Sequence, residues 1–335
     1  MGAGEAKRPL AVRIGTGVLR GLLALVLFLM VLLLILRAQA AWREGDAQAP
    51  ANITYFATPA GKVAARVTGP ADGIPVVLIH GTAAWSAFWS EVADHLASRG
   101  WKVVAIDLPP FGWSDRDPEA RYDRTTQAER LSAVLSTLGK PAIVVGHSFG
   151  AGTAAELALR HPSQLRGLVL VDAALGELDP QSEAPVANVM RVGPVAQLAT
   201  AAMVTNPNAL EPFLRSMIAR KEAARRWVPV LRQPMARDGT TSAYAAWLSN
   251  LFTRQDQALS RSSANMRAIK PPVAIVWGDA DTVTPLDQGR RLQELTRARS
   301  LLILPGVGHI PHIEAPDAFR AALDEALASV SKEKK

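Results

Sequence analysis

The feature that most constrains the fold is one segment, VVGHSFGAGTAAELALRHP at residues 144–162, which changes from a strand pattern to a helix pattern within five residues. Its first residues are β-branched and apolar, which favours a buried strand, and residues 151–160 are rich in helix formers. At the change, Ser148 stands between Gly146 and Gly150, and glycines remove the Cβ atoms that so tight a bend would bring into contact. We therefore expect Ser148 to lie on the outside of a sharp turn.

The pattern G-x-S-x-G after a strand and before a helix is typical of a nucleophile elbow. In that arrangement the serine Oγ stands above the sheet, and the positive end of the helix dipole points at the reacting group. The alternative is a glycine-flanked turn whose serine caps the helix. A serine hydroxyl is a weak nucleophile, so the elbow predicts a histidine base and an orienting carboxylate later in the chain.

Short apolar runs rich in β-branched residues recur after residue 52. Helical stretches lie between several of them, as at residues 85–98, 125–138 and 150–159. Alternating strands and helices form a mostly parallel sheet with helices on both faces, so the predicted class is α/β. The predicted strands are 62–68, 76–79, 103–106, 143–145, 168–171, 273–277 and 301–304.

The alternation is interrupted at residues 176–270, which show no strand pattern over a length too great for a loop. Ala, Arg, Met and Leu recur there with helical spacing. We interpret this stretch as a helical insertion between two strands of the sheet. The predicted units are a helical cap at 176–269 and a core at 52–175 and 270–331.

The base and the acid both follow in suitable places. LLILPGVGHIPHIEAP puts His309 in a glycine-containing loop after the last predicted strand, and VAIVWGDADTVTP puts Asp281 in the loop after the strand before it. The chain order Ser148, Asp281, His309 is the order associated with the elbow. Asp279 has the position of a turn-former. Asp172, at the end of the strand before the insertion, is the alternative acid.

With these residues the chain resembles the α/β-hydrolase family over roughly residues 55–330. VVLIHGTAAW is similar to the family's His-Gly segment, VVAIDLPPFGWS to its Asp-x-Pro-x-x-Gly-x-Ser segment, WGDADTVTP to its acid loop and GHIPHIEAP to its histidine loop. The resemblance implies a carboxylesterase-like serine hydrolase with Ser148 as nucleophile, His309 as general base and Asp281 as orienting acid. It implies no metal and no organic cofactor.

The resemblance also implies an oxyanion hole made by the backbone N–H groups of Thr82 and Phe149, which would hold the charge of a tetrahedral intermediate. The implied reaction is cleavage of an ester-like or other carbonyl-activated bond through an acyl-enzyme. Hydrolysis of a carbon–carbon bond is one alternative. The other is a non-catalytic ligand-binding protein of the same fold.

The substrate pocket is expected to be hydrophobic and to take a hydrophobic small molecule. Trp85 and Trp113 lie near its predicted rim, His147 precedes the nucleophile, and Trp247 lies in the predicted cap. These four are the predicted pocket residues. The methionines and other aromatic residues of 176–269 either line this pocket or form ordinary helix core.

An unbroken apolar run at residues 21–36, GLLALVLFLMVLLLIL, has to lie in lipid or in a protein core. With its flanks it predicts a transmembrane anchor over 18–37. Four basic residues and one acidic residue precede it, which places segment 1–20 in the cytoplasm and the catalytic domain on the exported side, periplasmic or extracellular. Residues 38–51 are predicted to be a linker. The alternative is a signal peptide cleaved near Ala40, which gives a secreted protein.

The composition excludes several classes of function. Lys and Arg number 37 against 30 Asp and Glu, a formal charge of +7, but the basic residues are scattered, so we expect no nucleic-acid partner. The chain has no cysteine, which excludes disulfides and thiolate chemistry. No metal-ligand spacing stands out among the six histidines. The sequence carries no feature that fixes an oligomeric state.

Overall fold

A single β-sheet forms the centre of the molecule. The computed structural model describes residues 10–179, 186–252 and 257–331, and within them the eight strands run in the order β1-β2-β4-β3-β5-β6-β7-β8. β2 pairs antiparallel with β1 and β4, and all other pairings are parallel. The strands are β1 (Thr54–Thr58), β2 (Gly61–Thr68), β3 (Pro75–Ile79), β4 (Lys102–Ile106), β5 (Ala142–His147), β6 (Leu165–Val171), β7 (Val273–Gly278) and β8 (Leu301–Leu304).

The predicted α/β class with a mostly parallel sheet is confirmed, and each of the seven predicted strands is present. β3, β5 and β7 are buried along their whole length, which is why they read as continuous apolar runs. The sequence did not predict β1. This strand lies at the exposed edge of the sheet, where the sequence TYFAT buries too little apolar surface to give a clear pattern.

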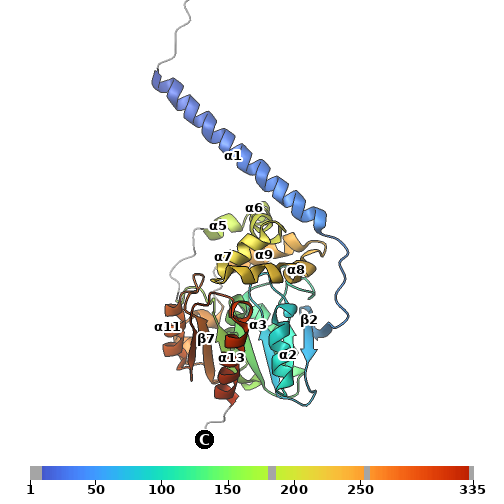
Figure 1. The fold of residues 1–335 in the computed structure, drawn as a ribbon. Helices are drawn as coiled ribbons and strands as arrows, with labels where there is room; N and C mark the ends of the chain where they lie inside the picture. The colour runs from blue at the N-terminus through green and yellow to red at the C-terminus, as the bar shows by residue number, and fades with distance from the viewer. Residues whose placement is uncertain (1–9, 180–185, 253–256, 332–335) are drawn as a thin grey trace, which may run out of the picture.

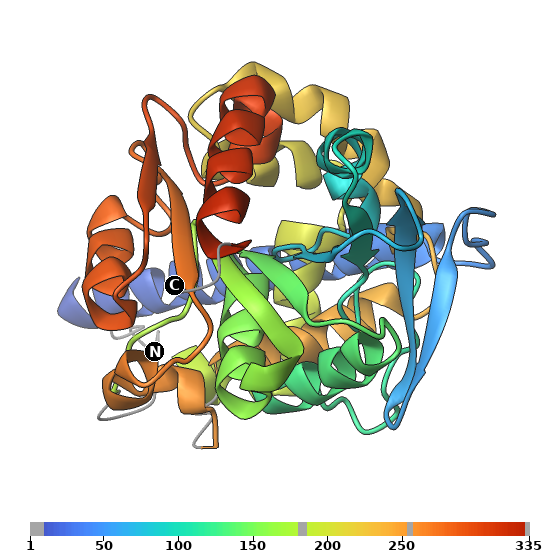
Figure 2. The same ribbon diagram turned by 90° about the horizontal axis from the view of Figure 1, so that it is seen from below.

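Helices cover both faces of the sheet (Figure 2). α2 (Ser90–Ser98) and α13 (Pro316–Ser331) pack on one face through residues such as Leu96, Phe319 and Leu323, each of which stabilises the fold by about 1.5–3 kcal/mol when fully buried. α3 (Arg124–Ser136), α4 (Phe149–Arg160) and α11 (Leu286–Thr296) pack on the other face. Two short helices complete this part of the chain: α10 (Ser263–Arg267) and α12 (Pro311–Glu314).

The segment between β6 and β7 is helical where the structure describes it, and we refer to its helices α5–α9 and a π-helical turn as the cap helices. They lie over the carboxyl ends of the strands (Figure 1). Phe88 joins them to the core by an edge-to-face contact with Trp227, with ring centroids 5.2 Å apart. The cap helices are α5 (Val186–Met190), α6 (Gly193–Thr200), the π-helical turn η3 (Ala201–Thr205), α7 (Leu210–Met217), α8 (Ala224–Met235) and α9 (Thr240–Phe252). The domain boundaries at 176 and 269 stay a prediction.

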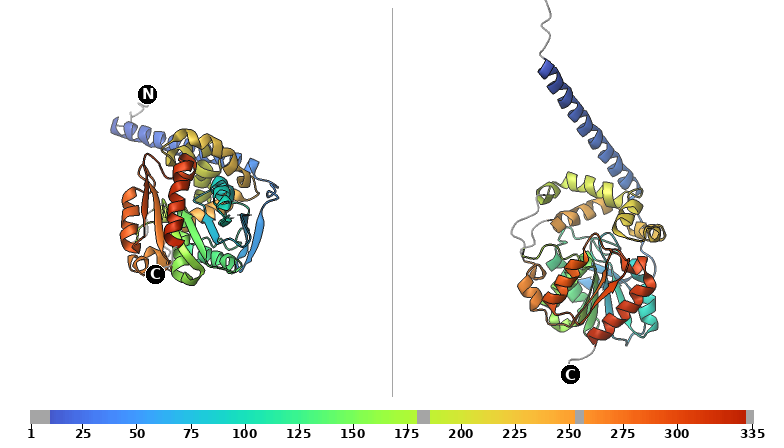
Figure 3. Two further views of the ribbon diagram at one scale, coloured as in Figure 1. Left: turned by 60° about the horizontal axis from the view of Figure 1, so that its bottom comes forward. Right: turned by 60° about the vertical axis from the view of Figure 1, so that its left-hand side comes forward.

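The N-terminal helix α1 (Leu10–Arg43) extends away from the globular part (Figure 1). Its residues 17–43 are long and apolar enough to cross a membrane. Its C-terminal end lies against the cap helices, and the end of α13 lies at the opposite end of the molecule (Figure 3). Gln39 and Asn206 form a hydrogen bond of 2.9 Å at this junction.

Candidate active site

Ser148 occupies the tight turn between β5 and α4. Its backbone has φ 51° and ψ −123°, a conformation that costs a non-glycine residue free energy and that recurs at functional sites. A Cβ at position 146 would lie 2.7 Å from the Cα of Ala151, and one at position 150 would lie 2.4 Å from the carbonyl oxygen of His80. Glycine at both positions therefore allows the turn that the sequence predicted.

A continuous hydrogen-bonded chain links Ser148, His309 and Asp281. The distance from Ser148 Oγ to His309 Nε2 is 2.8 Å, and that from His309 Nδ1 to Asp281 Oδ2 is also 2.8 Å. Asp281 lies in the loop after β7, and His309 lies in the loop after β8, so the three loops meet at the carboxyl edge of the sheet. All three residues are buried. The structure thus brings together the three side chains that the sequence singled out.

Asp281 is held as an anion by its neighbours. Its Oδ1 accepts the N–H groups of Val283 and Thr284 at 2.7 and 2.9 Å, and its Oδ2 accepts the Thr284 hydroxyl at 2.6 Å. Burial raises the pKa of Asp281, but the hydrogen bonds from His309 and Thr284 outweigh it, so the pKa lies below its usual value. The carboxylate can therefore fix His309 with Nδ1 protonated and Nε2 free to accept the serine proton.

The two rival aspartates have other surroundings. Asp279 accepts the N–H of Gly306 at 2.7 Å in an exposed turn. Asp172 Oδ1 accepts the N–H of Gly278 at 2.8 Å inside the core. Burial raises the pKa of Asp172 well above its usual range, and the nearby charge of Asp281 raises it further. Burial therefore favours the neutral acid form of Asp172, and its carboxyl group bonds to Gly278, whereas His309 Nδ1 bonds to Asp281.

Thr82 and Phe149 are the residues whose backbone N–H groups are predicted to form the oxyanion hole. Both residues line the same cavity as Ser148, and Phe149 is the first residue of α4, where the N–H groups of a helix lack internal acceptors. Gly81 allows the Thr82 loop to come this close, because a Cβ there would lie 3.0 Å from the Cβ of Ser148 and 2.9 Å from His147 Nδ1. The pair is suited to bind a developing oxyanion.

Two buried histidines support these loops in their neutral form. His80 Nδ1 donates to the Gly81 carbonyl at 2.7 Å and Nε2 accepts the N–H of Leu108 at 2.9 Å, so one tautomer satisfies both bonds. Burial lowers the pKa of His80 to about 4. His147 Nε2 donates to the His309 carbonyl at 2.8 Å, and burial, with the nearby His309, lowers the pKa of His147 to about 3. Both rings hold the loops through hydrogen bonds and carry no charge at neutral pH.

Glu314 is a site residue that the sequence did not identify. Its carboxylate accepts the N–H groups of Gly308 and Ile310, on either side of His309, at 3.0 and 3.1 Å. It also accepts the N–H groups of Ala219 and Arg220, which follow α7, at 2.8 and 3.1 Å. Its place in GHIPHIEAP was visible, but the link to the cap helices depends on the tertiary fold.

Ser148 and His309 open onto an apolar cavity of about 480 Å³ between the core and the cap helices, within the usual range for small-molecule sites. His147 and Trp247 line it, as predicted for the pocket. Most of the remaining lining comes from residues that the sequence did not assign to the pocket individually. They include Phe88, Leu210, Phe213, Leu214, Leu231, Leu248, Leu251 and Ile310. Met203 and Met217, for which the sequence left pocket wall and helix core open, line the cavity as well.

The structure does not bring Trp85 and Trp113 into this cavity. They pack edge to face against each other, with centroids 6.3 Å apart, beside the chain that follows α1. Trp85 Nε1 donates to the carbonyl of Val230 at 2.8 Å, and the Arg237 guanidinium lies over the Trp113 ring. Their large apolar surfaces pack between the core and α8. Their positions in the sequence did not reveal this packing.

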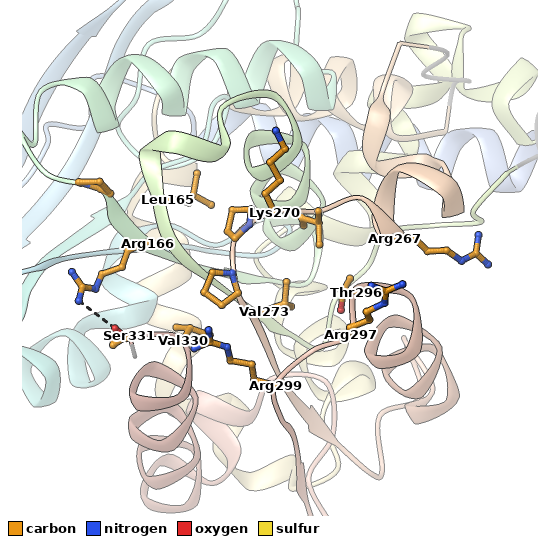
Figure 4. A pocket seen from close by; sticks show the side chains of 14 residues that line it. Leu165, Arg166, Arg267, Lys270, Val273, Thr296, Arg297, Arg299, Val330 and Ser331 are labelled. Atoms are coloured by element: carbon orange, nitrogen blue, oxygen red, sulfur yellow. Dashed lines mark hydrogen bonds between the residues drawn. The ribbon is translucent and has the colours of Figure 1, made fainter. Parts of the chain in front are cut away.

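A second cavity, of about 550 Å³, lies at the opposite end of the strands, near the starts of β6 and β7 (Figure 4). Its lining contains no histidine, and the labelled basic side chains point in different directions. The basic residues that line it are Arg166, Arg267, Lys270, Arg297 and Arg299. With no base beside a nucleophile, this cavity lacks the chemistry found around Ser148.

Within the described residues, no group of three or more His, Asp and Glu side chains is placed to hold a metal ion. Besides the Trp247 indole, the polar side chains that line the apolar cavity among the described residues are Thr82, His147, Ser148, Ser216 and His309, and the backbone N–H groups of Thr82 and Phe149 are the predicted oxyanion donors. This set can activate a hydroxyl, attack an electrophilic carbonyl and stabilise the resulting oxyanion.

Comparison with known proteins finds hydrolases and esterases among the relatives of this chain. The family model described as alpha/beta hydrolase fold matches residues 74–316. The chain is 30% identical to the pimeloyl-[acyl-carrier protein] methyl ester esterase of Chromobacterium violaceum (76% of this chain, 95% of the relative). It is 28% identical to the 2-hydroxymuconate semialdehyde hydrolase of Pseudomonas sp. strain CF600 (76% and 87%). Among solved structures, a membrane phospholipase A superposes with a TM-score of 0.65 at 22% identity (96% and 99%).

Proposed function

Because the chain belongs to the α/β-hydrolase fold family, we propose that it is a serine hydrolase that cleaves an ester bond in a neutral, hydrophobic small molecule. One observation carries the proposal. The hydrogen-bonded chain Ser148–His309–Asp281, with both distances at 2.8 Å, opens onto a cavity lined almost entirely by apolar side chains. The hydrolase activity of relatives such as the ester esterase supports it.

In the proposed first half-reaction, His309 Nε2 takes the hydroxyl proton as Ser148 Oγ attacks the carbonyl carbon. The backbone N–H groups of Thr82 and Phe149 hold the oxyanion, and the Asp281 carboxylate stabilises the imidazolium. Loss of one oxyanion donor typically raises the barrier by about 2.7–4 kcal/mol. His309 then gives its proton to the leaving alcohol, and an acyl-Ser148 ester remains.

In the second half-reaction a water molecule enters the position of the departed alcohol. His309 takes one of its protons, and the hydroxide attacks the acyl carbonyl. Collapse of the second tetrahedral intermediate breaks the bond to Ser148 Oγ, which regains its proton from His309. The carboxylic acid leaves, and the enzyme returns to its starting state.

The lining of the cavity supports a neutral substrate. Among the described residues the lining contains no Asp, Glu, Lys or Arg side chain, and a charged group inside it would lose its hydration without gaining a partner among them. The arginines near the cap helices face elsewhere: Arg226 pairs with Glu91, Arg215 with Glu211, and Arg220 bonds to Glu314. These arginines therefore offer no reason to propose a carboxylate group in the substrate.

Carbon–carbon bond hydrolysis fits this apolar lining less well than ester hydrolysis. The relative from Pseudomonas sp. is named for 2-hydroxymuconate semialdehyde, whose muconate part carries a carboxylate. A site for such a substrate needs a cation or several donors within the cavity, and the lining offers Ser216 and Thr82 besides the reacting groups. We therefore favour an ester.

We also propose that α1 anchors the enzyme to a membrane, with segment 1–20 in the cytoplasm and the hydrolase domain on the exported side. The length and apolar character of residues 17–43 support the anchor. The packing of Leu33 and Leu36 near the cap helices, with Ala40 buried, favours an intact helix over cleavage near Ala40. The N-terminal residue of the protein isolated from a cell envelope distinguishes the intact from the cleaved form, because the cleaved form begins close to residue 41.

The first experiment is labelling of the purified full chain in detergent with a fluorophosphonate probe, alongside Ser148→Ala. We expect stoichiometric labelling of the wild type, none of the variant, and turnover of p-nitrophenyl esters by the wild type alone. Labelling and turnover that survive in Ser148→Ala would overturn the proposed nucleophile. Folded, unlabelled wild type that binds an apolar ligand without turnover would instead favour the non-catalytic alternative.

A further inference from the structure

Helix α1 meets the rest of the chain at α6 and η3 of the cap (Figures 1 and 3). Leu33, Leu36 and Arg37 are partly buried and Ala40 is buried, whereas most of the apolar run is exposed. Their spacing of three or four residues puts them on one face of the helix. Contact between α1 and the cap therefore begins within the apolar run and continues past its end.

The part of the cap next to α1 is itself apolar. Residues 192–209 contain no Asp, Glu, Lys or Arg. Four large apolar side chains are exposed in this part of the cap, Val189 by 50%, Val192 by 51%, Val195 by 37% and Met203 by 54%, and we refer to these four as the apolar cap surface. Arg191, between Val189 and Val192 in the sequence, is exposed as well. Single exposed apolar side chains are common, but several together beside a membrane-spanning helix indicate an interaction surface.

The helix geometry sets the height of this surface relative to a bilayer. Gln39, which bonds Asn206 just after η3, is three residues beyond the last apolar residue, Leu36, or about 4.5 Å along the axis. The headgroup zone of one leaflet is about 5–7 Å thick. Trp42, 86% exposed, and Arg43 are six and seven residues beyond Leu36, about 9–10.5 Å along the axis, and so lie just outside this zone. If α1 spans the membrane, η3 and α6 lie in its interfacial layer.

The cap wall of the cavity and this surface share one residue. Met203 belongs to the apolar cap surface and also lines the cavity with Ala199 and Val204 from the same stretch of cap. An apolar molecule that leaves the bilayer beside η3 would thus meet apolar cap side chains before the cavity wall, with Arg37 of α1 and Arg191 next to Val192 as neighbouring charged side chains. A molecule from bulk water would gain nothing from this arrangement.

We propose that the apolar cap surface lies in the acyl-chain boundary of the bilayer and that the enzyme takes a neutral, long-chain ester directly from the lipid. The second half rests on the proposed hydrolase function. The ester C–O bond breaks, the acyl group passes to Ser148, and water releases a fatty acid and an alcohol. The first half, contact with lipid, is independent of catalysis.

The membrane contact is tested by fluorescence, and the absence of native cysteine makes single labels unambiguous. We label single-cysteine variants of the full chain with nitrobenzoxadiazole, at Val192→Cys and at Val195→Cys. The control is Lys140→Cys, at an exposed position near the far end of β5. All three variants are reconstituted in phosphatidylcholine vesicles whose acyl chains carry nitroxide. We expect blue-shifted, strongly quenched emission at 192 and 195 but not at 140. Equal behaviour at the three positions overturns the proposed contact.

The origin of the substrate is tested with the double variant Val192→Asp/Val195→Asp, whose positions do not line the cavity. Ile303→Asp is the matched control, since Ile303 is 37% exposed, like Val195, on the edge strand β8. We expect hydrolysis of diacylglycerol in phosphatidylcholine vesicles to fall by about tenfold or more in the double variant alone, with p-nitrophenyl butyrate hydrolysis in water unchanged.

The outcomes separate the two proposals. Equal loss on both substrates, or loss on neither, overturns entry from the bilayer while leaving the hydrolase intact. A wild-type chain that hydrolyses neither substrate and takes no fluorophosphonate overturns the hydrolase and with it the lipid ester. The quenching result then still decides whether the cap touches lipid.

Discussion

The two walls of the apolar cavity are built in different ways. On the core wall each reacting group is fixed by directional bonds: Ser148 to His309, His309 to Asp281, and Asp281 to two N–H groups and a hydroxyl. On the cap wall, Leu, Phe and Met side chains predominate, and Ser216 is the polar exception. Hydrogen bonds weaken steeply with misalignment, whereas apolar packing is non-directional. We infer that the core wall sets the rate and the cap wall sets the choice of substrate.

The largest effect should come from the core wall. Ser148→Ala removes the nucleophile, so we expect kcat for p-nitrophenyl hexanoate to fall by about 10⁵–10⁶-fold, as in other serine hydrolases. Affinity for an apolar ester analogue, measured by calorimetry, should change little, because the cap wall is intact. A large loss of affinity would mean that the two walls do not act separately.

Asp281 and Asp172 give a matched pair on the same wall. Asp281→Asn should lower kcat by about 10⁴-fold, because the amide favours the wrong tautomer of His309. Asp172→Asn should cost less than about tenfold, because burial raises the pKa of Asp172 and an amide resembles its neutral acid. Steady-state kinetics and melting temperatures of both variants test this. A larger loss of kcat in Asp172→Asn than in Asp281→Asn would make Asp172 the orienting acid.

Substitution of Glu314 tests the link between the two walls, because its carboxylate bonds to the loop of His309 and to the chain after α7. Glu314→Gln keeps the shape of the side chain but replaces one acceptor oxygen by a donor that faces N–H groups. We expect a loss of about 1.5–3 kcal/mol in the free energy of unfolding and a lower kcat, because the loop of His309 is released. Asp279→Asn, with its single bond in an exposed turn, is the control. Similar effects in the two variants would show that Glu314 does not position His309.

A smaller and selective effect is expected on the cap wall. Leu248→Trp reduces the cavity without touching a polar group, since Leu248 is half-buried and lines it. We expect kcat/KM for p-nitrophenyl octanoate to fall by about tenfold or more, and that for the acetate to stay within about twofold. A uniform loss across chain lengths would place the reacting ester, not its acyl chain, against this residue.

The smallest effect concerns stability and pH. His312 stacks on Trp89 at 4.2 Å, and neither ring nitrogen has a hydrogen-bond partner among the described residues. Burial, followed by the nearby His147 and His309, lowers the pKa of His312 well below its usual value. The folded state then binds no proton while the unfolded chain binds one below about pH 6.5, so His312 removes stability as the pH falls.

His312→Phe keeps an aromatic ring stacked on Trp89 and removes the group that takes up a proton when the chain unfolds. We expect its melting temperature to exceed that of the wild type by roughly 2–4 °C at pH 5, with a smaller difference at pH 7.5. Scanning calorimetry at the two pH values is the measurement. A difference that does not grow toward low pH would show that His312 is not held neutral in the fold.

Much of the fold was predictable because its signals are local. Continuous apolar runs gave the central strands, and the glycine-flanked serine gave the turn at Ser148. The edge strand β1 was missed because an exposed strand has no strong pattern. Trp85 and Trp113 were misplaced because a tryptophan beside a site in sequence can face either way, and these two seal the joint with α8.

The sequence by itself determined the sheet, the turn at Ser148 and the order in which the serine, the acid and the base follow strands of one sheet. Parallel strands end at a common edge, so their loops have to meet there. The tertiary structure decided which apolar cap side chains face the cavity, how Glu314 joins the cap to the loop of His309, and that α1 packs against α6 and η3. A leucine in a helix core and one in a pocket wall have the same local sequence, and only packing distinguishes them.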